Sequence, residues 1–290
     1  DFTQKYILKL GIIFLGIRLS FSEFLRFGTI ALPLIIVCIL SALVVVKLLI
    51  KKVSISSKMS YLIAIGTSVC GATAIVATAP IIDAKKTEVA YAIANITLFG
   101  VIAMLLYPYF AEWYFYGQPL QAGLFLGTAI HETSQVAAAG LIFDQQFNSP
   151  ETLNVATVTK LIRNTFLVVM IPLFGFLYNR GKVKDKNYSI LSIFPYFVIG
   201  FIGMIIVRNI GDQFFTIENN NYESWNAFIS YIKILATTFL TMAMAAVGIS
   251  INLSELRSMG YKPFVVGLIT SITVGLVSII SLETYLKVFL

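Results

Sequence analysis

Residues 61–82, YLIAIGTSVCGATAIVATAPII, decide the fold because this stretch is long and apolar enough to enter a membrane yet is interrupted in its middle. The middle, residues 66–73, is small and hydroxyl-rich, and Pro80 lies near the end. Glycine costs about 1 kcal/mol relative to alanine inside a helix. Within a membrane, interrupted backbone is tolerated only where protein or a water-filled cavity covers it. The stretch therefore predicts two half-helices that meet near Cys70–Thr73, although small residues also serve as a close-packing surface between helices.

A half-helix that begins near Thr73 would present free N–H groups and a positive dipole end inside the membrane, which suits an anion. Interrupted helices of this kind are the best indication of a transporter's binding site that a sequence offers. The predicted substrate-binding residues in this stretch are Thr67, Ser68, Cys70, Gly71, Ala72 and Thr73.

The composition indicates an all-α polytopic membrane protein. Of its 290 residues, 58% are hydrophobic and only 12% are charged, and several apolar runs reach the ~20 residues that cross a bilayer. The net charge of +7 comes from basic residues in short connections, which favours anionic lipid headgroups over nucleic acid as the partner. The two cysteines, Cys38 and Cys70, lie inside apolar runs, so neither a disulfide framework nor a metal site is expected.

About nine membrane spans are predicted, and the basic connections orient them. Lysines concentrate in residues 47–58, and lysines and an arginine concentrate in residues 179–188. The positive-inside rule then makes both connections cytoplasmic, places residues 83–88 on the outer side and leaves the C-terminus outside. The predicted spans are residues 4–20, 28–50, 61–82, 88–109, 120–140, 155–178, 190–208, 227–250 and 262–287.

A faint internal repeat divides the chain at residue 110. The span over 227–250 continues into a second small-residue stretch, MAMAAVGISIN (242–252), and, like 61–82, is followed by one further span. An odd number of crossings separates the two, which would orient them oppositely, as in an inverted repeat. We therefore expect two units, residues 1–110 and 111–290, and Gly248 joins the predicted substrate-binding residues.

His131 and Glu132 form an ionisable pair in the predicted span 120–140. A charged residue at this depth costs about 2.5–3.5 kcal/mol on insertion scales, so such residues are functional candidates by default. Histidine titrates near physiological pH, and the pair is predicted to couple ions together with Gln135 and Asn95. A neutral pair bonded to neighbouring helices is the structural alternative. The zinc-protease motif HExxH is not met, because Gln135 stands where the second histidine would be.

Lys160 and Arg163 lie three residues apart on one helical face of the next predicted span. Arginine matches the geometry of oxyanions, so Arg163 is predicted to bind an anionic substrate. The alternative is that both side chains extend to the headgroups at the membrane surface, which is easier for Lys160.

Five stretches carry a resemblance to a known family. They are GTSVCGATAIVATAPII (66–82), EVAYAIANITLFGVIAMLLYP (88–108), GTAIHETSQVAAAG (127–140), ATVTKLIRNTFLV (156–168) and MAMAAVGISINLSELRSMGYKP (242–263). Together they resemble the YeiH-type family of bacterial inner-membrane proteins, which is labelled as a family of sulfate exporters. The resemblance implies a fold similar to bile-acid sodium symporters and sodium–proton antiporters, in which two broken helices cross at mid-membrane. It also implies further hydrophobic helices before Asp1.

These features predict a secondary active transporter of a small, sulfate-like anion in the bacterial cytoplasmic membrane, coupled to protons or sodium. A sodium-coupled organic-anion carrier, a passive channel and a membrane enzyme that uses His131 and Glu132 are the alternatives. The chain lacks a GxxxxGK[ST] motif, and its single histidine leaves little for catalysis, so we expect neither an enzyme nor a cofactor. The sequence leaves open whether the chain forms a homodimer.

Overall fold

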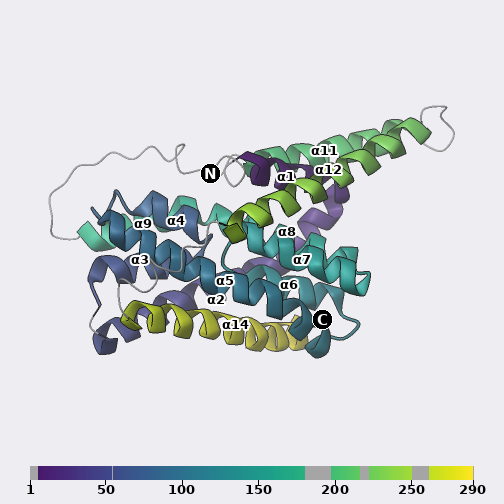
Figure 1. The fold of residues 1–290 in the computed structure, drawn as a ribbon. Coiled ribbons are helices and arrows are strands. Elements are labelled where there is room, and N and C mark those ends of the chain that lie inside the picture. The colour runs from purple at the N-terminus through teal and green to yellow at the C-terminus, as the bar shows by residue number, and fades with distance from the viewer. Residues whose placement is uncertain (1–5, 54, 180–196, 216–221, 250–260, 290) are drawn as a thin grey trace.

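The computed structural model describes residues 6–53, 55–179, 197–215, 222–249 and 261–289. In these ranges the chain forms helices and no strands (Figure 1). The α-helices are α1 (Leu8–Leu15), α2 (Phe21–Val53), α3 (Ser57–Ser68), α4 (Ala72–Thr78), α5 (Lys86–Tyr114), α6 (Pro119–Ala129), α7 (Thr133–Phe147), α8 (Pro150–Thr165), α9 (Leu167–Asn179), α11 (Phe197–Phe214), α12 (Tyr222–Ile249) and α14 (Tyr261–Phe289), and a short 3-10 helix, η2 (Gly16–Arg18), follows α1.

Three helices of the described residues, α2, α5 and α14, are long and apolar enough to cross a membrane. Helix α14 lies along the bottom of the view in Figure 1, where it packs extensively on α2 and also contacts α5. Their outward faces carry exposed apolar side chains, among them Leu48 on α2, Leu106 on α5 and Ile280 on α14. Because lipid is the solvent that accepts such faces, the chain is a multi-pass membrane protein.

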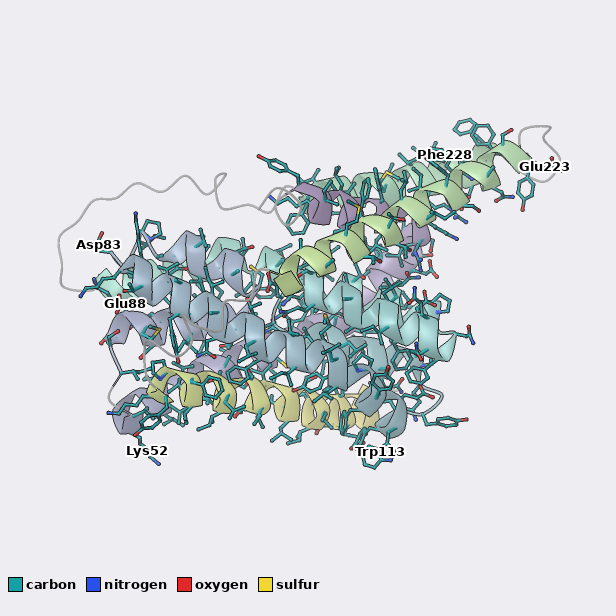
Figure 2. All side chains as sticks on the ribbon, viewed as in Figure 1. Lys52, Asp83, Glu88, Trp113, Glu223 and Phe228 are labelled. Carbon is teal, nitrogen blue, oxygen red and sulfur yellow. The ribbon has the colours of Figure 1, made fainter. Side chains whose placement is uncertain are left out.

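Helices α3 and α4 form a hairpin that enters the bundle and returns to the same end. The Lys58 ammonium, at the start of α3, donates to the Asp83 carbonyl beyond α4, and the Ser56 hydroxyl donates to the Glu88 carboxylate. Asp83 and Glu88 therefore lie at the end of the bundle where Lys52 also lies (Figure 2), called here the Lys52 end. With 12 residues, α3 is about 18 Å long, which is too short to cross ~30 Å of hydrocarbon. We call α3–α4 the first hairpin.

Helices α6 and α7 form a second hairpin, which enters from the opposite end. The Thr152 hydroxyl, just after α7, donates to the Pro119 carbonyl at the start of α6. The ring of Phe147, the last residue of α7, contacts Tyr109 near the end of α5, with 6.0 Å between centroids. Both ends of this hairpin thus lie with Trp113 at the far end of α5 (Figure 2), called here the Trp113 end. With 11 residues, α6 is about 16 Å long and also stops inside the bundle.

Helix α8 starts at the Trp113 end and packs along both arms of the second hairpin. Its contact with α6 is close because Gly123 and Gly127 present no side chain: a Cβ on Gly127 would lie 2.6 Å from the Cβ of Thr159. This is the small-xxx-small mode of helix packing in membranes. The chain then continues as α9 toward the first hairpin, where Phe174 contacts Tyr61 of α3 edge-on. Helices α8 and α9 together therefore run from the Trp113 end toward the Lys52 end.

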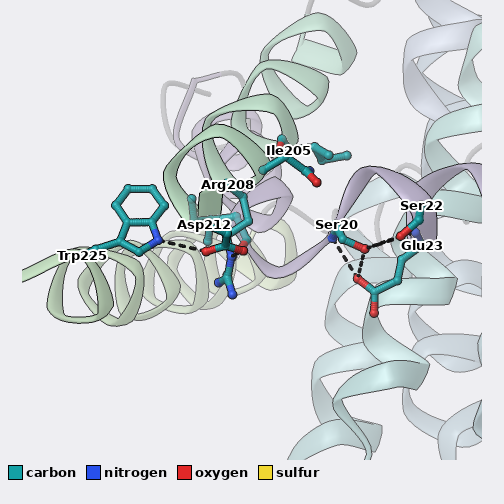
Figure 3. A network of polar contacts seen from close by, with 9 residues as sticks. Ser20, Ser22, Glu23, Ile205, Arg208, Asp212 and Trp225 are labelled. Atoms are coloured by element: carbon teal, nitrogen blue, oxygen red, sulfur yellow. Dashed lines mark hydrogen bonds and ion pairs between the residues drawn. The ribbon is translucent and has the colours of Figure 1, made fainter. Parts of the chain in front are cut away.

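Helices α1, α11 and α12 form a separate group that packs on α7 and α2 (Figure 1). Within the group, Asp212 of α11 accepts hydrogen bonds from Arg208 and from the Trp225 indole of α12 (Figure 3). The adjoining start of α2 is closed by a capping box, in which Ser20 and Glu23 exchange hydrogen bonds. Arg18 of η2 links the group to the rest through an ion pair with Asp144 of α7 at 3.2 Å.

The structure corrects three sequence expectations. Residues 61–82 and 120–140 are hairpins rather than spans, and residues 83–88 lie at the same end as Lys52 and residues 55–58 instead of the opposite end. Helix α12 is uninterrupted to Ile249, so no break is found in the described part of 242–252. Residues 250–252 and most of 179–188 lie outside the described residues. The division into units 1–110 and 111–290 stays a prediction.

Candidate functional site

Lys160 of α8 joins the tips of the two hairpins. The first tip is residues 69–71 and the second tip is residues 130–132. The Lys160 ammonium is completely buried and donates hydrogen bonds to the carbonyls of Val69 at 2.8 Å, Ile130 at 3.2 Å and His131. Because an ammonium has three donors, these contacts use all of them. The alternative in which Lys160 extends to the headgroups is therefore excluded, because its ammonium is buried.

Arg163, one turn further along α8, holds the last turns of α3 and α6. Its Nε donates to the Ser68 carbonyl at 2.9 Å and Nη2 donates to the Thr67 carbonyl. Its Nη1 donates to the Thr128 carbonyl at 2.6 Å and, at 3.5 Å, to that of Ile130. The last carbonyls of a helix have no partner within it and carry a partial negative charge. Lys160 and Arg163 thus neutralise the C-terminal ends of both half-helices.

The two tips touch each other at Gly71 and Glu132. Gly71 has φ +65° and ψ −125°, a conformation that residues with a Cβ avoid. A Cβ on Gly71 would lie 3.3 Å from the Cβ of Glu132. Glycine is therefore needed here both for the turn of the first hairpin and for the approach of the second.

The residues predicted to bind substrate in 67–73 all lie at or beside the first tip. Thr67 and Ser68 are buried, and their hydroxyls donate to carbonyls of their own helix, Ile63 and Ile65 respectively. Cys70 is also buried, Ala72 is half-buried and Thr73 is exposed. The first tip thus has a closed side, which faces Arg163, and an open side at Thr73. Gly248 lies in the last turn of α12.

The second tip carries polar atoms without partners. Helix α7 begins at Thr133, inside the bundle, and its first N–H groups have no acceptor within the helix. Close to this start, His131 Nδ1, Glu132 Oε2 and Ser134 Oγ are buried without a hydrogen-bond partner, as is Oδ1 of Asn164, whose amide donates to the Thr133 hydroxyl at 2.9 Å. Buried polar groups are rarely left unpaired, so these four atoms mark the second tip as the candidate site.

Gln135 and Asn95, predicted to couple ions, lie in contacts between helices. Gln135 of α7 donates to the Thr97 carbonyl of α5 at 3.1 Å, and Asn95 of α5 donates to the Pro263 carbonyl of α14 at 2.9 Å. Each side chain packs where a glycine leaves room, Gln135 on Gly100 and Asn95 on Gly267. In the described residues, no three His, Cys, Asp or Glu side chains are grouped so as to hold a metal ion.

Helix α14 contributes residues that the sequence analysis missed. Ser271 bonds His131 Nε2 at 2.9 Å, and the Ser278 and Thr128 hydroxyls share a hydrogen bond of 2.6 Å. Gly267 and Gly275 on the same helix receive Asn95 and the Tyr107 hydroxyl. The signal was present in the sequence as small residues at helical spacing, at positions 267, 271, 275 and 278.

Comparison with known proteins identifies relatives along the whole chain. The family model described as "Conserved hypothetical protein 698" matches residues 1–267. A UPF0324 membrane protein of Fusobacterium nucleatum is 35% identical over 295 residues, covering 100% of this chain and 84% of the relative. One from Clostridium tetani is 34% identical, covering 96% and 80%, and one from Streptococcus agalactiae is 33% identical, covering 92% and 76%. No solved structure shows a significant match. The chain therefore belongs to the UPF0324 membrane protein family, the YeiH-type family that its motifs resemble.

Proposed function

We propose that this chain is a secondary active transporter of a small, sulfate-like anion that works by alternating access. The observation that carries the proposal is the start of α7 inside the bundle, surrounded by the unpartnered buried atoms of His131, Glu132, Ser134 and Asn164. Half-helix ends that point at a substrate within the membrane are the recurrent feature of secondary transporters.

The balance of charge supports an anion as the substrate. The negative ends of α3 and α6 are neutralised by Arg163 and Lys160, whereas the positive end of α7 has no side-chain cap. An anion at the start of α7 would supply the missing partner. Arg163 was predicted to contact the anion itself. In this proposal its four bonds to carbonyls make it a residue that builds the site, and the open side of the first tip, Ala72 and Thr73, borders the anion.

Glu132 supports coupling to protons. It is the N-cap residue of α7, so its carboxylate and a bound anion would compete for the same helix end. Two like charges in a site of low dielectric repel strongly. A proton on Glu132 would remove that repulsion, so binding of the anion and of the proton would favour each other.

The arrangement of the hairpins supports alternating access and an orientation. The hairpins enter from opposite ends, as an inverted repeat requires, although the second interrupted element is α6–α7 rather than the span over 227–250. Lys52, Lys58, Lys85 and Lys86 gather at the Lys52 end, which we assign to the cytoplasmic side of a bacterial inner membrane. The C-terminus is then outside.

The test is accumulation in proteoliposomes together with a thermal-shift screen in detergent. The screen uses sulfate, sulfite, taurine and dicarboxylates, because a ligand that binds only the folded state raises its stability by mass action. We expect one sulfur oxyanion to stabilise the protein selectively and to accumulate against its gradient when an inward proton gradient is imposed. Flux that only dissipates the anion gradient would indicate a channel, and no response to any anion would refute the proposal.

A further inference from the structure

The Lys160 ammonium lies in a cage of main-chain oxygens from both hairpins. Its three acceptors are the carbonyls of Val69, Ile130 and His131, at the two positions where the helices break. The side chain reaches this cage from a third element, α8, and is completely buried. Among the described residues no carboxylate forms an ion pair with it, and all three of its hydrogen-bond acceptors are main-chain carbonyl oxygens.

Such a cage is what a coupling cation requires. In transporters with broken helices, unwound carbonyls and the C-terminal ends of half-helices coordinate sodium. Hard cations of this kind take oxygen ligands, among them backbone carbonyls. A lysine ammonium is likewise a compact point charge that needs only acceptors around it. The cage therefore provides to Lys160 the same interactions that it would provide to a free monovalent cation.

We propose that Lys160 occupies the position of a coupling cation, so that this junction carries a tethered ammonium and binds no sodium. The inference deepens the proposed transport function, on which its mechanistic meaning rests, by naming Lys160 as the residue that excludes alkali cations from the coupling step. Arg163 does not duplicate this role, because it bonds Thr67, Ser68 and Thr128 in the preceding turns, and only the Ile130 carbonyl is shared.

A consequence is that removal of the ammonium creates a cation site. In Lys160→Ala the three carbonyls keep their places but lose their donor, and the truncated side chain leaves space between them. In Lys160→Met the charge is lost as well, but a side chain of similar length fills that space. The two variants thus separate a vacated cation site from the mere absence of charge.

The experiment measures the apparent Tm of detergent-purified wild type and both variants in sodium, potassium, ammonium or choline chloride at equal ionic strength. We expect at least one of the three small cations to raise the Tm of Lys160→Ala above its value in choline, with a dependence on concentration that saturates. Wild type and Lys160→Met are expected to have the same Tm in all four salts. No anion substrate and no flux enter this measurement, so its failure is distinct from failure of the transport proposal.

Two results would overturn the inference. One is selective stabilisation of the wild type by sodium, because the ammonium would then not occupy the place of the ion. The other is a Lys160→Ala protein whose stability does not depend on the cation, or that fails to fold in every one of the four salts. Recovery of folded Lys160→Ala protein only when a small cation replaces choline would support it.

Discussion

Lys58 and Asp83 lie side by side, because the Lys58 ammonium donates a hydrogen bond to the Asp83 carbonyl. The 24 intervening residues therefore leave and re-enter the same end of the bundle. To test this, single cysteines replace Lys52, Lys86 or Gln118, all exposed, in a background with Cys38→Ala and Cys70→Ala. A membrane-impermeant thiol reagent should label positions 52 and 86 from the same side and position 118 from the other.

The position that decides between the two topologies is Lys86. If residues 61–82 crossed the membrane as one span, a cysteine at position 86 would be labelled together with position 118. That pattern would exclude the first hairpin.

Gly71→Ala should destabilise the protein through backbone strain. Its φ of +65° is unfavourable for any residue with a Cβ, and the added carbon would press on Glu132. Strain of this kind costs about 1–3 kcal/mol, so a lower apparent Tm is expected. The matched control is Gly203→Ala in α11, where a Cβ would meet no atom within 4 Å and helix propensity predicts a gain of up to about 1 kcal/mol. Equal effects of the two substitutions would contradict the role given to Gly71.

Arg163→Ala should lower stability strongly because four carbonyl contacts lose their donor. Hydrogen bonds from a charged group contribute about 1.5–3 kcal/mol each, so the loss is expected to be roughly 3 kcal/mol or more, measured as a drop in Tm. Arg26→Ala, an exposed arginine on α2, serves as the control and should change little. An Arg163→Ala protein of normal stability that binds anions weakly would instead favour direct contact between Arg163 and the substrate.

Glu132→Gln should change transport and leave folding intact. Glu132 Oε2 has no hydrogen-bond partner, so the amide disrupts no contact of that atom. The variant cannot gain or lose a proton, and we expect anion uptake that no longer varies with pH, measured in proteoliposomes from pH 5 to 8. Glu223→Gln, the same substitution at an exposed glutamate in the first turn of α12, is the control and should keep the pH dependence of the wild type. Unchanged pH dependence in Glu132→Gln would remove Glu132 from the coupling mechanism.

The break in the first hairpin could be predicted from sequence, whereas the break in the second could not. Gly66 and Gly71 with their hydroxyl neighbours interrupt an apolar run, and a glycine at positive φ is found where the sequence predicted a turn. The second break, at Ile130–Glu132, has no glycine or proline within it. Its backbone is extended at Ile130 and Glu132, and Lys160 and Arg163 of α8 both donate to the Ile130 carbonyl. Those partners are about thirty residues away in sequence, so local pattern gave no signal of the interruption.

The sequence also could not predict how many times the chain crosses the membrane. Residues 61–82 have the length and apolarity of a span, and length and apolarity are all that a hydropathy pattern measures. Whether such a stretch crosses or returns depends on which end receives its last residues, here fixed by the contact of Lys58 with Asp83.

The sequence by itself determined that this chain is a helical membrane protein and that its first interruption lies near Cys70–Thr73, because composition and local backbone preference control these properties. Only the tertiary structure decided that two hairpins meet tip to tip and that Lys160 and Arg163 bond carbonyls. The physical reason is that Lys160 and Arg163 bond main-chain carbonyls at the ends of half-helices. Every residue has a main-chain carbonyl, so the sequence does not indicate which carbonyls will be bonded.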